Sequence, residues 1–193
     1  MAEETIDPTV ETTEPTMAQM TAELVRERAK TEAKLTPVSA LAYEGQMLDE
    51  TQQQELLDEI QADEQCADVK LMRASAGTAY LYSTNSMSDT YARILLRAED
   101  GNPYETMAGT VREESETYPR PTMVGMFKDP TFGLDPDQVE RIAKEIVQLP
   151  EYSDLQLVEA STGAIYLYSD RHLDKDLAES LVEWDEVGKY KSL

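Results

Sequence analysis

The sequence predicts an α+β protein of two tandem β-α-β-β-α repeats, preceded by a disordered acidic tail and a helix. The strongest observation is a duplication: residues 68–83 return as residues 154–169, at an offset of 86 positions. At that offset, residues 48–96 match residues 134–182 at 16 of 49 positions, whereas average residue usage gives about one match in fifteen. An internal repeat of this kind indicates the architecture and the number of domains more strongly than any single motif.

Composition limits the classes of partner. The chain has 193 residues, 40% of them hydrophobic, and a net charge of −22, which allows one large or two small cores. A polyanion repels both nucleic-acid phosphates and anionic lipids, so we expect neither nucleic acid nor a membrane as partner. The acidity also allows an alternative, in which the protein mimics the charge of DNA. Acidity spread along a whole chain is, however, more typical of an adaptation for solubility or salt tolerance. No apolar run resembles a membrane span or a signal peptide, so the expected location is the cytoplasm.

The first 35 residues divide into a tail and a helix. Residues 1–16 hold five acidic residues and no basic one, which predicts a disordered acidic tail. In residues 17–35, Met17, Met20 and Leu24 recur near helical spacing, which predicts an amphipathic helix. That helix either packs on its own domain or docks on a partner, and its thin stripe rich in methionine suits the second role.

The first repeat is placed at residues 36–99 and the second at residues 120–193. Each copy opens with an apolar stretch led by proline, residues 37–43 and 121–127, which predicts a short strand. These two stretches align at an offset of 84, so the second copy is expected to have gained two residues around 129–133.

Each repeat continues with a helix, a hairpin and a second helix. The apolar periodicity around Leu56 and Ile142 predicts the first helix of each copy. The hairpins follow, each with a glycine after two small residues, Gly77 or Gly163, because glycine supplies the positive φ of a tight loop. Residues 88–97 and 173–184 then read as the second helices.

Residues 100–119 form a linker that has room for one more strand. A strand at 107–111 would complete a ferredoxin-like βαββαβ unit, and only residues 187–193 could do the same in the second copy. Each copy is about 65 residues long and marginal by itself. We therefore expect the two repeats to pack together as a pseudo-twofold pair.

Catalytic signatures are missing from the sequence. It contains no glycine-rich phosphate loop, no His-Glu-x-x-His and no Gly-x-Ser-x-Gly elbow. The sequence contains one cysteine, Cys66, and one histidine, His172, which excludes an intrachain disulfide and the usual zinc ligand sets. A catalytic dyad of these two residues remains conceivable. Acidic pairs on helix faces lack EF-hand spacing. The sequence therefore predicts no catalytic residue, metal or cofactor, and a protein that is not an enzyme.

Tyrosines mark the second strand of each hairpin. Alternation along the strand puts Tyr80 and Tyr82 on one sheet face, and Tyr166 and Tyr168 repeat this arrangement. A two-layer unit covers only one sheet face with helices, which leaves the tyrosine face free. The tyrosine faces either pack against each other, across the two repeats or in a homodimer, or they form an aromatic platform that binds a partner or a ligand.

The leading hypothesis is a non-catalytic protein-interaction module: a subunit, adaptor or assembly factor of a larger complex, with another protein as its partner. The first alternative is a module that senses a small molecule at the repeat junction, and the second is an enzyme based on carboxylates. The candidate residues for partner or ligand binding are Tyr80, Tyr82, Tyr166, Tyr168, Met17, Met20 and Leu24.

Overall fold

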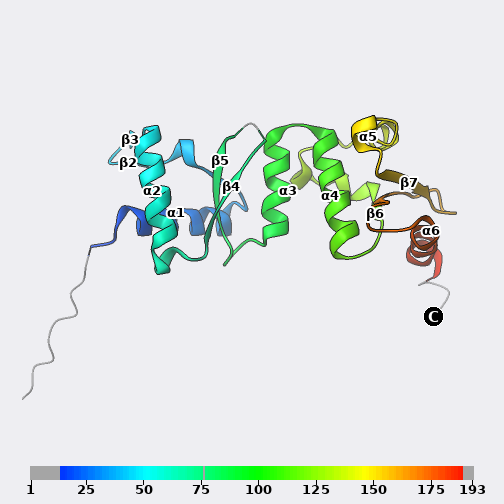
Figure 1. Cartoon of the computed structure of the whole chain (residues 1–193), viewed down its shortest axis with the longest axis horizontal. Coiled ribbons are helices and arrows are strands. Elements are labelled where there is room, and N and C mark those ends of the chain that lie inside the picture. The colour runs from blue at the N-terminus through cyan, green and yellow to red at the C-terminus, as the bar shows by residue number, and fades with distance from the viewer. Residues whose placement is uncertain (1–13, 76, 189–193) are drawn as a thin grey trace, which may run out of the picture. The chain divides into compact units, whose positions relative to one another are not determined.

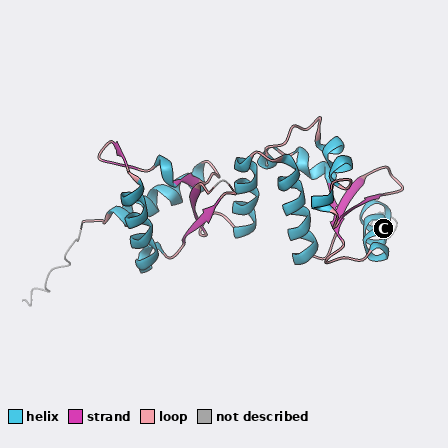
Figure 2. Ribbon diagram, turned by 45° about the horizontal axis from the view of Figure 1, so that its top comes forward, coloured by secondary structure: helices cyan, strands magenta, loops and turns pink. Residues whose placement is uncertain are grey.

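The computed structural model describes residues 14–75 and 77–188. All but the last three residues of the predicted disordered tail, 1–16, lie outside this described part. The chain is a mixed α/β protein with small antiparallel sheets (Figures 1 and 2). It divides into two compact units, residues 1–71 with 80–87 and residues 72–79 with 88–193.

In the first unit, two helices pack against each other. Helix α1 (Met17–Thr31) begins at Thr16, whose hydroxyl accepts a hydrogen bond from the Gln19 amide, while the Gln19 side chain accepts one from the Thr16 amide. Asp49 and Gln52 cap helix α2 (Glu50–Ala62) in the same way. Figure 1 shows α1 crossing α2, and the two helices are in contact. The buried face of α1 is lined by small residues, Ala18, Ala22, Val25 and Ala29.

The strands of the first repeat form a sheet in the order β1-β5-β4. These strands are β1 (Thr36–Pro37), β4 (Val69–Arg73) and β5 (Ala79–Ser83). A separate small hairpin pairs β2 (Ala42–Tyr43) with β3 (Gln46–Met47). Short 3-10 turns, η1 (Val38–Ala40) and η2 (Glu64–Cys66), connect these elements.

The second unit begins with two helices, α3 (Asp89–Asp100) and α4 (Pro103–Thr117). Gly101 joins them with φ of 68°, a left-handed conformation that favours glycine. The remaining elements are β6 (Thr122–Met123), η3 (Val124–Lys128), η4 (Pro130–Phe132), α5 (Val139–Ile146), η5 (Pro150–Tyr152), β7 (Leu155–Glu159), β8 (Ile165–Ser169), α6 (Lys175–Glu183) and the π-helical turn η6 (Trp184–Gly188). Their sheet has the order β6-β8-β7.

Both faces of this second sheet are covered. Leu155 and Leu167 point into a core that includes residues of α4, α5 and the turns η3 to η5. Tyr166 and Tyr168 point into a second cluster, which contains Ala178 and Val182 of α6. The second repeat therefore has three layers, because successive strand residues point to opposite faces and helices lie on both.

The hairpin predictions are confirmed. Strands β7 and β8 pair antiparallel, and β4 lies beside β5 in its sheet. Gly77 and Gly163 have φ of 90° and 87° in the two loops.

Several other predictions are wrong. The strands led by proline are only two residues long and give way at once to 3-10 turns. The expected offset of 84 also fails, because Thr36 pairs with Leu81 and Thr122 with Leu167, at an offset of 86 in both positions. No residues were gained in the second copy between these points.

The predicted strand at 107–111 is part of helix α4. Asn102 accepts hydrogen bonds from the first amides of α4, and Pro103 occupies the first turn, where its missing N–H costs nothing. Each repeat sheet therefore has three strands among the described residues, and the strand expected to complete a ferredoxin-like unit in the first copy is helical instead. In the second copy, residues 187–188 belong to η6 and 189–193 lie outside the described part.

Helix α4 is the counterpart of α1. Both have 15 residues, and their first residues, 17 and 103, are separated by the repeat offset of 86. Each repeat thus begins with a helix. The repeat bounds predicted from the sequence leave this helix out: residues 17–35 are a separate helix in that prediction, and residues 100–119 are a linker. No helix among the described residues is both long and apolar enough to span a membrane.

Candidate protein-interaction surface

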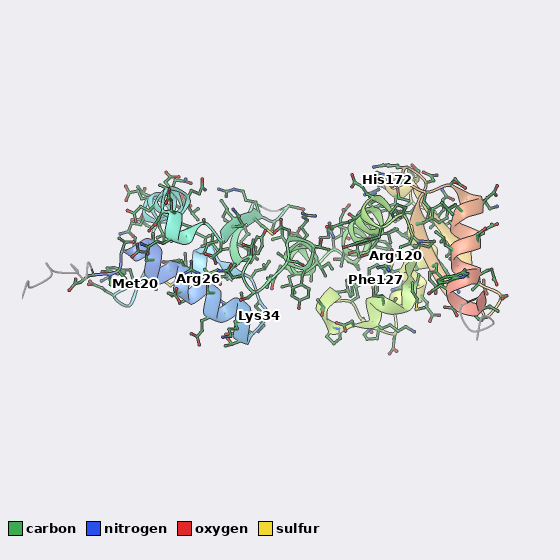
Figure 3. The ribbon with its side chains drawn as sticks, turned by 90° about the horizontal axis from the view of Figure 1, so that it is seen from below. Met20, Arg26, Lys34, Arg120, Phe127 and His172 are labelled. Carbon is green, nitrogen blue, oxygen red and sulfur yellow. The ribbon has the colours of Figure 1, made fainter. Side chains whose placement is uncertain are left out.

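An exposed apolar groove lies in the first unit, between α1 and the β2–β3 hairpin. Met20 and Leu24 of α1 are 41% and 52% exposed, and Tyr43 of the hairpin is 44% exposed. These side chains line an open groove of about 460 Å³, and Figure 3 labels Met20 on α1. Met47, 61% exposed, lines the adjoining hollow on the other side of the hairpin. The half-buried Met17 lines both hollows.

The helical period explains this groove. Small residues turn one face of α1 towards α2, while Met20 and Leu24, four positions apart, share a different face that stays exposed. Glu23 and Glu27 are exposed on the same side of the helix. An exposed apolar patch with a charged rim is typical of a protein-binding site. The structure therefore brings together three of the predicted binding residues, Met17, Met20 and Leu24.

The predicted tyrosine platform has a different environment. Tyr166 and Tyr168 are each 3% exposed and Tyr82 is 4% exposed, while Tyr80 is half-buried. In the second repeat, α6 covers the tyrosine face, so the expectation that helices cover only one sheet face is wrong. The reason is that helices both precede and follow the β7–β8 hairpin, and the two groups pack on opposite faces of its sheet.

Tyr166 is further held by two carboxylates. Its hydroxyl donates to Asp185 and Glu186, at 3.0 and 2.6 Å. Burial, followed by these two hydrogen bonds, raises the pKa of Tyr166 far above its usual range. These interactions fasten the turn η6, which follows α6, to strand β8, so Tyr166 has a structural role in this repeat.

A buried polar cluster occurs once in each repeat. In the second, Arg112 donates to Asp154 from Nε and Nη2 at 2.9 and 2.6 Å, and the Ser169 hydroxyl donates to Asp154 at 2.9 Å. In the first repeat, Arg26 and Ser83 bind Asp68 in the same manner. Each cluster ties the first helix of a repeat to its hairpin.

No prediction from the sequence included these clusters, although the duplication itself points to them. All three residues of one cluster recur in the other at the offset of 86. The arginine hydrogen bonds lower the pKa of Asp154 to about 2 and lower that of Asp68. A general acid needs a pKa near the working pH, so these carboxylates act as ion-pair partners that hold the fold.

The cysteine and the histidine lie in contrasting environments. Cys66 is 1% exposed, and burial raises the pKa of its thiol, which keeps the thiol protonated and unreactive. His172, labelled in Figure 3, is exposed. Within residues 14–75 and 77–188, no group of three or more His, Cys, Asp or Glu side chains is arranged to hold a metal ion.

Comparison with known proteins identifies a family for the whole chain. The family described as "YdhW C-terminal domain" matches residues 16–102 and again residues 100–190, and each match includes the first helix of a repeat. The Escherichia coli (strain K12) protein described as "Uncharacterized protein YdhW" is 31% identical over 180 residues, which cover 93% of this chain and 83% of the relative. No solved structure matches. The chain therefore belongs to the YdhW family, with two consecutive matches to its C-terminal domain.

Proposed function

We propose that this protein is a non-catalytic interaction module, a subunit, adaptor or assembly factor, that binds another protein through the groove between α1 and the β2–β3 hairpin. The observation that supports it is the exposure of Met20, Leu24 and Tyr43 around this groove, with Met47 exposed in the adjoining hollow. Large apolar side chains exposed together are costly to keep in water and gain energy when a partner covers them. Its one buried cysteine fits a cytoplasmic location, which belongs to the same proposal.

The residue types in the groove also suit binding. Methionine adapts its shape to different partners, and tyrosine offers a large contact area at a low entropy cost. Hot spots at the centre of an interface are typically surrounded by a polar rim. Glu23, Glu27 and Glu44 are exposed around this apolar centre.

The test uses the tagged full-length chain and a matched pair of double variants. Met20→Thr/Leu24→Thr removes the apolar face of α1, whereas Met126→Thr/Leu177→Thr changes one methionine and one leucine of similar exposure, 38% and 44%, in the second unit. Proteins captured from the cells that make this chain are purified, and their dissociation constants are measured. We expect the first double variant to weaken binding by at least about tenfold and the second to leave it unchanged.

Two results would contradict the proposal. One is that the wild-type chain retains no protein in stoichiometric amount. The other is that both double variants bind the captured protein as tightly as the wild type. That result would show that the groove is not part of the interface. Substitution of Tyr82 would be a poor test, because it is 4% exposed and its loss would leave a cavity.

A further inference from the structure

The second repeat shows what fills the corresponding groove there. Helix α3 packs against α4 and against the turn η4. The Thr106 hydroxyl donates to the Arg97 carbonyl at 3.1 Å, and Arg97 donates to Glu113 at 3.0 Å. A Cβ at Gly109 would lie 2.5 Å from Arg97 Nε, so glycine permits this close approach. Arg93 also pairs with Glu113.

The first repeat has the same two walls with its groove open. At the offset of 86, Met20 and Leu24 replace Thr106 and Thr110, and residues 44–46 at the tip of the hairpin replace η4. Thr106 and Thr110 are 1% and 3% exposed, whereas Met20 and Leu24 are 41% and 52% exposed. One helix face is therefore covered in the second repeat and exposed in the first.

We propose that the groove of the first repeat binds an amphipathic helix of a partner protein, seated on α1 as α3 is seated on α4, with apolar residues flanked by two basic residues one turn apart. This proposal rests on the proposed function and adds which kind of segment occupies its groove. Arg93 and Arg97 provide the template for the basic pair, because both bind Glu113.

Carboxylates outnumber the one arginine at this groove and favour a basic helix. Arg28 lines the groove but pairs with Glu32 at 3.7 Å, and Glu23 pairs with Arg26. Glu27 takes the place of Glu113 and is exposed, and Glu23 takes the place of Gly109. Because Met20, Glu23 and Leu24 are all larger than their counterparts, the bound helix lies farther from α1 than α3 does from α4. The longer apolar side chains fill that added distance and supply the buried surface.

A second copy of this chain fits the groove poorly. Its helix α3, which carries Arg93 and Arg97, is already seated on its own α4. The counterpart of α3 is α6, in which Glu179 and Glu183 replace Arg93 and Arg97. Seated on α1, these two carboxylates would face Glu23 and Glu27, and like charges across an interface are unfavourable. The net charge of −22 adds to this repulsion. The occupant is therefore a helix of a different, basic character.

The probe that tests this proposal is the α3 sequence itself. A fluorescent peptide of residues 88–101, held helical by a staple because so short a helix is marginal in water, is titrated onto the full-length chain, with fluorescence anisotropy as the readout. A second peptide carries Arg93→Glu and Arg97→Glu. We expect the native peptide to bind at least about tenfold more tightly than the reversed one.

Variants of the full-length chain locate the binding site. Glu27→Lys should reverse the preference between the two peptides, and Met20→Thr/Leu24→Thr should abolish binding of both. Glu99→Lys makes the same change in net charge at an exposed site in the second unit and should leave binding unchanged. Equal binding of the two peptides, no binding of either, or an equal effect of Glu27→Lys and Glu99→Lys would overturn the proposal.

The capture experiment with the double variants judges the proposed function separately. A captured protein that depends on Met20 and Leu24 but contacts the groove through an acidic or extended segment would refute the basic-helix inference and leave the proposed function intact. If the capture experiment also fails, the proposed function falls with the inference.

Discussion

At the scale of single residues, the Arg–Asp–Ser clusters are the most specific contacts in the fold. Asp154 has a side chain only 5% exposed, accepts hydrogen bonds from Arg112 and Ser169, and forms an ion pair with Arg171. Asp68 is 12% exposed and is bound by Arg26 and Ser83. A buried ion pair is costly to break from one side, because the remaining charge stays buried without compensation.

Asp154→Asn should therefore lower the free energy of unfolding by about 3 kcal/mol, since Arg112 loses its charged partner. Urea denaturation followed by circular dichroism measures this change. Asp176→Asn, an exposed position on α6, is the control and should change stability by no more than about 0.5 kcal/mol. Similar effects of the two substitutions would show that the cluster does not stabilise the second repeat.

The same carboxylate predicts a pH dependence. Arg112 holds the pKa of Asp154 at about 2 in the native state, below the value of about 3.9 in an unfolded chain. Because the folded-state pKa is depressed, the stabilisation is fully present above about pH 3.9 and is lost as the pH falls through about 2. The difference in melting temperature between the wild type and Asp154→Asn should shrink as the pH falls from about 3.9 through about 2, and a constant difference would contradict this assignment.

At the scale of elements, α6 determines the environment of the tyrosine strand. Ala178 is fully buried in the cluster that contains Tyr166 and Tyr168, whereas its neighbour Leu177 is 44% exposed. These adjacent residues therefore separate the buried face of α6 from its exposed face.

Ala178→Asp should displace α6, because it places an unpaired charge in the apolar layer. We expect a loss of about 3 kcal/mol in the free energy of unfolding, together with greater modification of Tyr166 and Tyr168 in hydroxyl-radical footprinting. Leu177→Asp adds the same charge on the exposed face and should change neither measurement appreciably. If both variants behave alike, α6 does not cover these tyrosines in solution.

Helix α4 shows where local sequence patterns are ambiguous. Met107, Ala108 and Val111 occur in a short apolar stretch that fits a strand or a helix. The difference comes from Asn102, which caps the helix, and from the packing of α4 against α3, α5 and β8. Comparison of α4 with α1 at the full repeat offset would have revealed the helix, since the two begin 86 positions apart.

At the scale of the whole molecule, the two repeats differ in how deeply their hairpins are buried. Strand β8 has four buried residues and its counterpart β5 has three, while β7 has two and its counterpart β4 has one. The core of the second repeat also includes two aromatic rings in an edge-to-face contact, Phe127 and Phe132. The same chain pattern thus supports two cores of unequal depth.

Hydrogen exchange of the free full-length chain should reflect this difference. We expect the amides of β7 and β8 to exchange at least about tenfold more slowly than those of β4 and β5, because exchange requires opening of the more deeply buried hairpin. Mass spectrometry of peptic fragments measures both hairpins in one sample. Equal protection of the two hairpins would show that their difference in burial does not translate into local stability.

The sequence by itself determined the duplication, both glycine hairpins, the helix that begins at Met17 and the acidic character of the chain. That helix ends at Thr31, four residues before the predicted end at residue 35. These features depend on residue identity and on short-range periodicity, which are complete in the sequence. Tertiary structure alone decided that α6 covers Tyr166 and Tyr168, that Arg112 meets Asp154, and that Met20 and Leu24 stay exposed where their counterparts are buried. These outcomes depend on which helix packs on which face, and such contacts join residues far apart in the chain that no local pattern specifies.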